Sequence, residues 1–310
     1  MIKVLFMGTP YFSTKILESL INSQEIEVVG VVTKKDSEQG RKRILTESPV
    51  ALLAKENNLK VFKIEKFKDE VENLKALNAD LIVTAAYGKI LPESFLSIPK
   101  YASINVHASL LPKYRGASPI EASIKNGDKE TGITIMYMDK GMDTGNIIKE
   151  EKVIIEETDN LTSLTKKLAE LGSNMIVDNI KEIVNNKNES IKQNDEEATY
   201  THVITREDEH LDFNNNAEVV FNKVRSLADE PGAYVKLNNE IVKIYEGYVL
   251  KEESNKKVGT IIKLLKDGIA VKTKDYLYVI TKLKPQGKKV MDAKSYINGL
   301  KEDIVGDIYE

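Results

Sequence analysis

Short apolar runs alternate along the first part of the chain with segments that place an apolar residue at every third or fourth position. Short runs bounded by turn residues are typical of buried strands, and the longer spacing is typical of amphipathic helices. Because strand, helix and strand in succession form a βαβ unit, the pattern predicts an open, doubly wound α/β domain with a mostly parallel sheet. The expected strands cover residues 2–7, 28–32, 60–62, 81–85, 102–106 and 134–138.

Helices are expected between these strands. The hydroxyl of Ser13 is placed to cap the first of them, which would run through Leu17 and Leu20. The other helices of this domain are expected at residues 49–57, 70–77 and 161–184.

The amino-acid pattern of the chain changes after residue 188. Residues 189–206 are polar and poor in aliphatic side chains, so they are expected to form a linker. Beyond them, a helix at 217–227 precedes five or six short β-rich runs separated by turn signals, which predicts a smaller OB-like β-barrel. We therefore expect a first domain at 1–188, a linker at 189–206 and a C-terminal domain at 207–310.

Composition narrows the class of protein. The 310 residues have a net charge of −3 and a hydrophobic fraction of 41%, as in ordinary globular proteins, and no apolar run is long enough for a membrane span. The chain has no cysteine, which excludes disulfides and thiol chemistry and is consistent with the cytoplasm, where we expect the protein. Its three histidines lack the spacing of metal ligands, so no metal site is expected.

Polar side chains follow the ends of two predicted strands. Asn105 and His107 are two residues apart at the end of one strand, so both should point to the same face. Asp143 lies in a glycine-flanked turn after another strand. Ligands of open α/β sheets bind beyond the carboxyl ends of the strands, which is where these residues are expected. The dinucleotide fingerprint GxGxxG is absent after the first strand, which disfavours a nicotinamide dehydrogenase.

An amide, an imidazole and a carboxylate suit the attack of an amine on a formyl carbon. Asn105 and His107 can donate to the oxyanion that forms, and Asp143 can accept the proton of the attacking nitrogen and orient the imidazole. A second interpretation stays open for each residue alone. A histidine at a strand end is often part of the scaffold, and an aspartate in a glycine turn can simply form that turn.

Longer motifs around these residues are more specific. NVHASLLPKYRGASP begins at Asn105, and MDKGMDTG contains Asp143; FMGTPYFS, TAAYGKILPE, ATYTHVITRED and LKPQGKKVMDA lie elsewhere along the chain. Together they resemble the folate-dependent formyltransferases from end to end. The resemblance implies transfer of the formyl group of 10-formyltetrahydrofolate to the amino group of initiator methionyl-tRNA, with a doubly wound catalytic domain and an OB-like tRNA-binding domain.

The resemblance also implies roles for individual residues. Asn105, His107 and Asp143 match the catalytic trio of the family. A folate-binding element and the lining of a pterin pocket match Ser109, Leu110, Leu111 and Pro112, together with Tyr87, Gly88, Ile90 and Leu91.

Recognition of tRNA should be largely electrostatic, because phosphate contacts dominate nucleic-acid affinity. Residues 243–294 hold 13 lysines and six acidic residues, which is typical either of a solvated surface or of a nucleic-acid contact. A basic loop resembles the inserted loop of the family. The residues expected to contact tRNA are Lys34, Lys35, Arg41, Lys42, Arg43, Arg206, Lys284, Lys288 and Lys289. The expected partners are the tRNA and the reduced folate, with no membrane, and the protein is expected to be a monomer.

Three segments depart from the family pattern, namely the loop at 39–46, Asp229–Gly232, and Val203. Two other functions stay open beside the expected one. The same trio could formylate an amino sugar nucleotide, although such an enzyme has less use for a basic C-terminal barrel. An OB-like module could also make the protein a non-catalytic RNA-binding protein, but a polar trio would then have no purpose.

Overall fold

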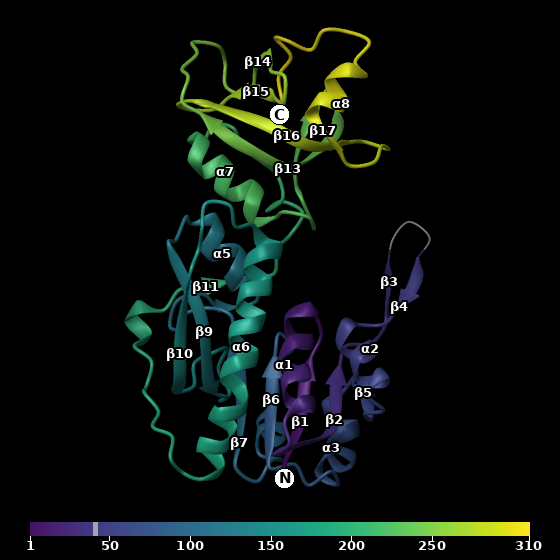
Figure 1. The fold of residues 1–310 in the computed structure, drawn as a ribbon, viewed down its shortest axis with the longest axis vertical. Coiled ribbons are helices and arrows are strands. Elements are labelled where there is room, and N and C mark those ends of the chain that lie inside the picture. The colour runs from purple at the N-terminus through teal and green to yellow at the C-terminus, as the bar shows by residue number, and fades with distance from the viewer. Residues whose placement is uncertain (40–42) are drawn as a thin grey trace. The chain divides into compact units, whose positions relative to one another are not determined.

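The structure is a computed structural model that describes residues 1–39 and 43–310 (Figure 1). The chain divides into two compact units. Unit 1 consists of Met1–Pro119, Glu130–Ile154 and Thr165–His202, and unit 2 of Ile120–Lys129, Ile155–Leu164 and Val203–Glu310. Two short segments of the expected first domain thus cluster with the C-terminal part, and the boundaries drawn from the sequence stay a prediction.

Unit 1 is built on a seven-stranded sheet. Its strands are β1 (Ile2–Gly8), β2 (Ile26–Thr33), β5 (Val61–Lys63), β6 (Leu81–Ala85), β7 (Ala102–His107), β9 (Glu130–Tyr137) and β10 (Ile147–Ile154). The strand order is β10-β9-β7-β6-β1-β2-β5, with β7, β6, β1, β2 and β5 parallel to one another. Strand β9 runs antiparallel to β7, and β10 antiparallel to β9. The mostly parallel, doubly wound sheet expected from the hydrophobic pattern is confirmed.

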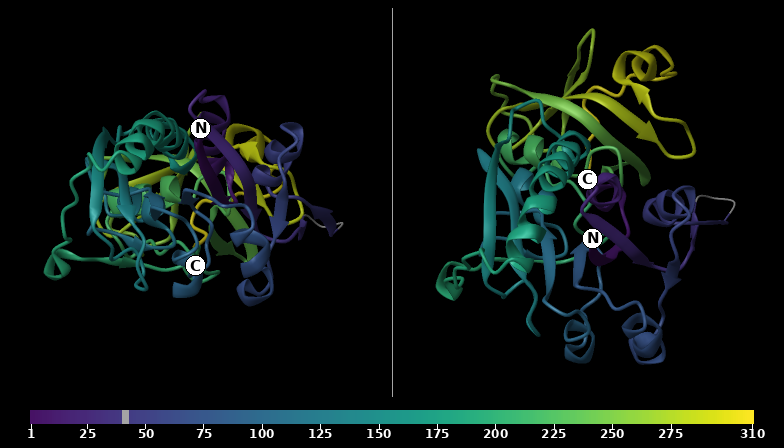
Figure 2. Two further views of the ribbon diagram at one scale, coloured as in Figure 1. Left: turned by 90° about the horizontal axis from the view of Figure 1, so that it is seen from below. Right: turned by 60° about the horizontal axis from the view of Figure 1, so that its bottom comes forward.

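Helices cover both faces of this sheet, as the right-hand view of Figure 2 shows. They are α1 (Tyr11–Asn22), α2 (Pro49–Glu56), α3 (Phe67–Lys75), α4 (Glu93–Leu96) and α6 (Leu161–Val184). On one face, Gly172 of α6 lies against Val106 of β7 and Ile16 of α1, and α1 contacts α2. On the other face, α3 and α4 contribute Leu74 and Phe95 to a buried apolar cluster with the sheet. Burial on two faces explains why the parallel strands are continuously apolar.

Ser13 does not have the capping role expected from the sequence. Helix α1 begins at Tyr11, its N-cap Pro10 makes no side-chain cap, and the Ser13 hydroxyl donates to the carbonyl of Ala85 at 2.5 Å. The prediction was wrong because Ser13 is fully buried inside the first turn, where the end of β6 offers its hydroxyl an acceptor.

Several short elements carry no clear sequence signal. Edge strand β10 contains the charged run at 149–152, and charged side chains are usual on an exposed sheet edge. The predicted linker contributes a 3₁₀ turn at Asp195–Glu197 and strand β11 (Tyr200–Thr201), which pairs in parallel with β8 (Arg115–Gly116). A further hairpin joins β3 (Ser37–Gln39) and β4 (Ile44–Thr46). The polar linker segment is therefore largely packed onto unit 1.

Unit 2 holds an antiparallel sheet with the order β12-β13-β16-β15-β14, and β17 pairs with β16. The strands are β12 (Ala233–Leu237), β13 (Glu240–Leu250), β14 (Ile261–Leu264), β15 (Ile269–Lys272), β16 (Leu277–Pro285) and β17 (Met291–Asp292). The helices are α5 (Pro119–Lys125), most of which clusters with this unit, α7 (Ala217–Ser226) and α8 (Ala293–Asn298). This is the separate antiparallel β domain that the sequence predicts.

Backbone hydrogen bonds link the two edges of this sheet through residues 306–310. Lys236 of β12 exchanges two bonds with Glu310, at 2.7 and 2.9 Å. Ile261 of β14 donates to Asp307 at 2.8 Å and accepts from Gly306 at 2.9 Å. The segment thus fills the gap between strands β12 and β14, an arrangement that fits the expected barrel-like closure.

Across the described residues, none of the helices combines the length and apolar character that a transmembrane passage demands.

Candidate active site

Strand β7 presents two polar side chains to one face of the sheet. Asn105 and His107 alternate with the buried Ile104 and Val106, and Val106 faces α6, so the polar pair points to the opposite face. His107 is the last residue of the strand and is only 5% exposed. The shared orientation expected from the two-residue spacing is therefore present.

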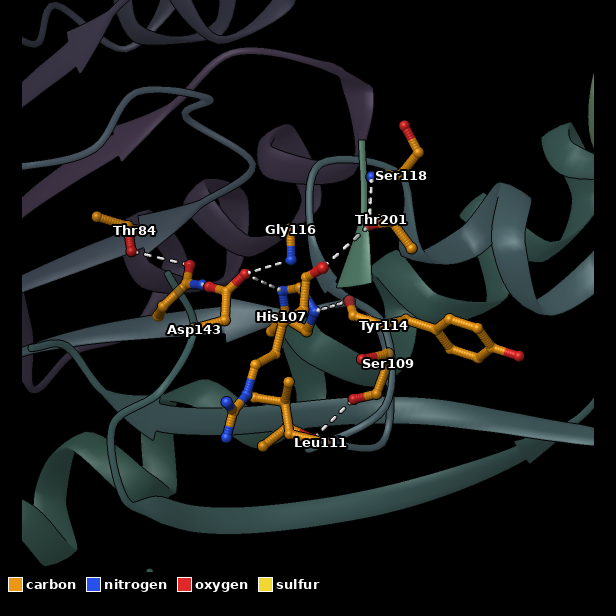
Figure 3. A network of polar contacts seen from close by, with 12 residues as sticks. Thr84, His107, Ser109, Leu111, Tyr114, Gly116, Ser118, Asp143 and Thr201 are labelled. Carbon is orange, nitrogen blue, oxygen red and sulfur yellow. Dashed lines mark hydrogen bonds and ion pairs between the residues drawn. The ribbon is translucent and has the colours of Figure 1, made fainter. Parts of the chain in front are cut away.

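Asp143 reaches this pair from the turn between β9 and β10 (Figure 3). Its Oδ1 accepts a hydrogen bond from Nδ2 of Asn105 at 3.2 Å. Its Oδ2 lies 3.6 Å from Nδ1 of His107 and accepts from the backbone N–H of Gly116 at 2.8 Å. The structure therefore brings an amide, an imidazole and a carboxylate together around one point, although they come from segments some 38 residues apart.

The hydrogen bonds of Asn105 fix which way its amide faces. A carboxylate accepts only, so the amide nitrogen must face Asp143 and the amide oxygen must face away from it. That oxygen accepts from the hydroxyl of Thr84, at the end of β6, at 2.9 Å. The NH₂ group is thereby held on the side of the carboxylate and the imidazole, where it can donate to a developing oxyanion.

The hydrogen bonds of His107 likewise fix its ring. Nε2 lies 2.9 Å from the carbonyl oxygen of Tyr114, which can only accept, so this nitrogen carries a proton. Nδ1 is left to face Asp143. A proton on Nδ1 would be shared between His107 and the carboxylate, and it is the only ring proton available for donation to a substrate.

The loop after β7 is held against β9. The hydroxyl of Thr134 donates to the carbonyl of Ser109 at 2.7 Å and accepts from the N–H of Leu111 at 3.1 Å. Ser109 and Leu111 are buried, whereas Leu110 and Pro112 are partly exposed. Of the four residues of the expected folate element, Leu110 and Pro112 are therefore the two whose side chains a ligand could contact.

The loop after β6 also contains both buried and exposed residues. Tyr87 and Leu91 are each only 3% exposed and belong to the apolar cluster beneath α3 and α4. Ile90 is 72% exposed, and Gly88 is exposed with Lys34 Nζ beside it. The side chains of Tyr87 and Leu91 therefore support the loop from below, and their role toward folate stays a prediction.

The basic residues expected to contact tRNA are spread over both units. Arg41 and Lys42 lie outside the described residues. Lys34 and Lys35 are exposed in unit 1, with Lys35 paired to Glu65, and Arg43 pairs with Glu38 at the β3–β4 hairpin. In unit 2, Arg206 stacks on the ring of Tyr234 at 3.9 Å and pairs with Glu209. Lys284 is partly exposed, and Lys288 and Lys289 are exposed.

Sequence reasoning missed several residues that hold the trio. Thr84 and Gly116 are hydrogen-bonded to its members, and Gln193 and Arg115 stand behind Asp143. Gln193 lies in a polar stretch without periodicity, and Arg115 looks like any loop arginine. The only feature of the sequence that could have pointed to Arg115 is the glycine directly after it, Gly116.

Over residues 1–39 and 43–310, no three His, Cys, Asp or Glu side chains gather closely enough to hold a metal ion.

Both units of the chain are similar to known proteins. Residues 2–180 match the family model described as Formyl transferase, and residues 203–301 match that described as Formyl transferase, C-terminal domain. The methionyl-tRNA formyltransferase of Staphylococcus epidermidis is 45% identical, over 99% of this chain and 99% of that protein. That of Staphylococcus aureus is 44% identical at the same coverage of both chains.

Solved structures share the fold. An N-formyltransferase from Helicobacter canadensis, in complex with folinic acid and dTDP-3-aminofucose, has a TM-score of 0.67 at 23% identity, over 90% of this chain and 98% of that chain. Phosphoribosylglycinamide formyltransferase from Bacillus halodurans has a TM-score of 0.51 at 28% identity, over 59% and 95%. Because the first family model covers more than half of the chain and the relatives match it from end to end, the chain belongs to the formyl transferase family.

Proposed function

We propose that this protein transfers the formyl group of 10-formyltetrahydrofolate to the amino group of initiator methionyl-tRNA. The observation that carries the proposal is the 45% identity to a methionyl-tRNA formyltransferase across both units. The product would be N-formylmethionyl-tRNA, the substrate of translation initiation. We expect the enzyme to work as a monomer in the cytoplasm, with residues 1–188 as catalytic domain, 189–206 as linker and 207–310 as tRNA-binding domain.

The reaction joins the amine nitrogen to the formyl carbon and breaks the bond from that carbon to N10 of the folate. An oxyanion develops on the formyl oxygen, where we place the Nδ2–H of Asn105 as a donor, joined by the Nδ1–H of His107 when both nitrogens of its ring carry a proton. Loss of one such donor typically costs about 3 kcal/mol of transition-state stabilisation. Both donors point to the side of Asp143, which supports a shared binding point for the formyl group.

Asp143 is proposed to take the proton that the attacking nitrogen must lose. Its side chain is 16% exposed, so it can be reached by a substrate while three neighbours keep it in place. The proton can then return to N10 of the leaving folate, which balances the reaction without a metal or a covalent enzyme intermediate. An α-amino group has a pKa near 8, so part of the substrate is already neutral at pH 7.

The folate is proposed to bind at the loops after β6 and β7. Leu110 and Pro112 offer partly exposed apolar surface, Ile90 offers an exposed apolar side chain, and Gly88 leaves the backbone accessible. Ser109, Leu111, Tyr87 and Leu91 would shape these loops from within. The tRNA is proposed to contact the exposed cations of both units named above.

The test is a formyl-transfer assay with labelled 10-formyltetrahydrofolate and either initiator or elongator methionyl-tRNA. We expect label on the initiator tRNA, released by deacylation as N-formylmethionine, and little on free methionine. The matched control is Asp143→Asn, which keeps the size of the side chain but cannot take up the proton. Label on dTDP-amino sugars and none on methionyl-tRNA would assign the protein to the amino sugar class instead. Tight tRNA binding with no transfer would favour the non-catalytic alternative.

A further inference from the structure

The backbone of Asp143 adopts a conformation that needs support. Its φ is +55°, in the left-handed region that costs most residues other than glycine about 1–2 kcal/mol and that aspartate tolerates better than most. Such conformations persist where surrounding contacts over-determine them. The contacts with Asn105, His107 and Gly116 hold only the carboxylate of Asp143. The peptide groups of its turn need contacts of their own.

The side-chain amide of Gln193 holds them. Its Nε2 donates to the carbonyl oxygen of Asp143 at 2.8 Å and to that of Gly145 at 2.8 Å. Gln193 lies after α6 in the polar stretch, yet it is only 5% exposed. The carbonyls of Asp143 and of Gly145, two residues further along the turn, are thus bound by one buried NH₂ group.

The other end of the same amide is anchored on Arg115. The amide oxygen of Gln193 accepts from Nε and Nη2 of this arginine at 3.0 and 2.8 Å. A guanidinium only donates and a carbonyl only accepts, so the amide can face one way alone. Arg115 is 1% exposed and is itself held by Asp195 at 2.8 Å and by the hydroxyl of Tyr200 at 3.1 Å.

These contacts close a ring around the carboxylate. Arg115 holds Gln193, Gln193 holds the backbone of Asp143, and the carboxylate of Asp143 is held by the N–H of Gly116, the residue next to Arg115. Figure 3 shows the last of these contacts, between Gly116 and Asp143. A shift of Gln193 would therefore move the carboxylate relative to Asn105 and His107. We infer that Gln193 is a positioning residue, which sets the place of the Asp143 carboxylate through the backbone of its turn; the inference rests on the proposed function.

Two substitutions separate this role from a merely structural one. Gln193→Met keeps the volume but removes every hydrogen bond of the side chain. Gln193→Glu keeps the partner of Arg115 but places a carboxylate oxygen against the two carbonyls. If the NH₂ group positions Asp143, both variants should lose kcat by about 10- to 100-fold, as expected for a displacement near 1 Å, while KM for each substrate changes less than threefold. The matched control is Gln24→Met, at an exposed turn before β2.

The second readout is coupling to Asp143. In an Asp143→Asn background, Gln193→Met should reduce kcat by less than threefold more, because its effect passes through the lost carboxylate. Near-normal kcat of Gln193→Glu would overturn the inference, since Gln193 would then only satisfy Arg115. Fully multiplicative losses in the double variant would also overturn it. Absence of transfer by the unaltered protein and by Gln24→Met would instead contradict the proposed function.

Discussion

Among single residues, Thr84 decides how the Asn105 amide is presented. It is 3% exposed, and its hydroxyl lies 2.9 Å from Oδ1 of Asn105. Thr84→Val has nearly the same shape but cannot donate, so the amide loses the bond that opposes its rotation. We expect kcat to fall by about tenfold, or about 1.4 kcal/mol, with little change in KM for the folate. Thr84→Ser keeps the hydroxyl and should retain most of the activity. Equal losses in both variants would assign the effect to packing.

Tyr87 offers a second test at this scale, because its hydroxyl is buried without a hydrogen-bond partner among the described residues. Burial raises the pKa of Tyr87 to about 12. Removal of an unpaired buried hydroxyl relieves a desolvation cost of about 1–3 kcal/mol, so Tyr87→Phe should unfold at higher urea concentration. KM for the folate should stay unchanged. A several-fold rise in this KM would show that the hydroxyl binds folate directly.

The same residue predicts a pH dependence. The unfolded chain ionises Tyr87 near pH 10, whereas the folded chain holds the proton to about pH 12. The stability due to the raised pKa is therefore present below pH 10 and is lost as the pH rises toward 12. Urea unfolding at pH 8 and pH 11 should show that the advantage of Tyr87→Phe grows at the higher pH. An advantage that shrinks with pH would contradict this.

At the scale of elements, the apolar strands and the orientation of the polar residues at the end of β7 were predictable from the sequence, because both follow from local patterns. The shared face of Asn105 and His107 needs only the period of a strand. Strand β10, the β8–β11 pair and the place of Gln193 were not predictable. Their residues are polar or charged, and they are fixed by partners up to 86 positions away rather than by neighbours in sequence.

The β8–β11 pair predicts a strict requirement for glycine at position 116. The φ of Gly116 is +113°, and an added Cβ would lie 2.3 Å from the carbonyl oxygen of Thr201. Gly116→Ala should therefore separate β8 from β11 and displace the N–H that holds Asp143. We expect destabilisation of about 2–4 kcal/mol and loss of most transfer activity.

The matched control is Gly306→Ala, where φ is +100° but no atom lies within 4 Å of the added Cβ. It should show only the backbone cost, about 1–2 kcal/mol, with activity retained. Thermal unfolding and the transfer assay measure both variants. Equal destabilisation of the two would mean that the close approach to Thr201 does not matter.

At the scale of the whole molecule, the tRNA should bind through charge. The net charge is −3, so attraction has to come from local clusters rather than from the average field. Lys288 and Lys289 are adjacent, exposed and follow the β16 strand of unit 2. Each phosphate contact adds about 0.7–0.9 to the slope of log affinity against log salt. Lys288→Glu with Lys289→Glu should thus lower this slope by about 1.5 and raise KM for tRNA.

The control for this double reversal is Lys256→Glu with Lys257→Glu, which changes the net charge by the same amount at another exposed lysine pair of unit 2. If binding follows overall charge, both double variants should weaken tRNA binding equally, because the long-range field changes equally. If it follows contact, only the pair at 288 and 289 should change the salt slope, since counterions are released only where a lysine meets a phosphate. KM for the folate should stay constant in both variants, and titration of KM for tRNA between 50 and 200 mM salt separates the two outcomes. An unchanged slope for the first pair would remove these lysines from the contact surface.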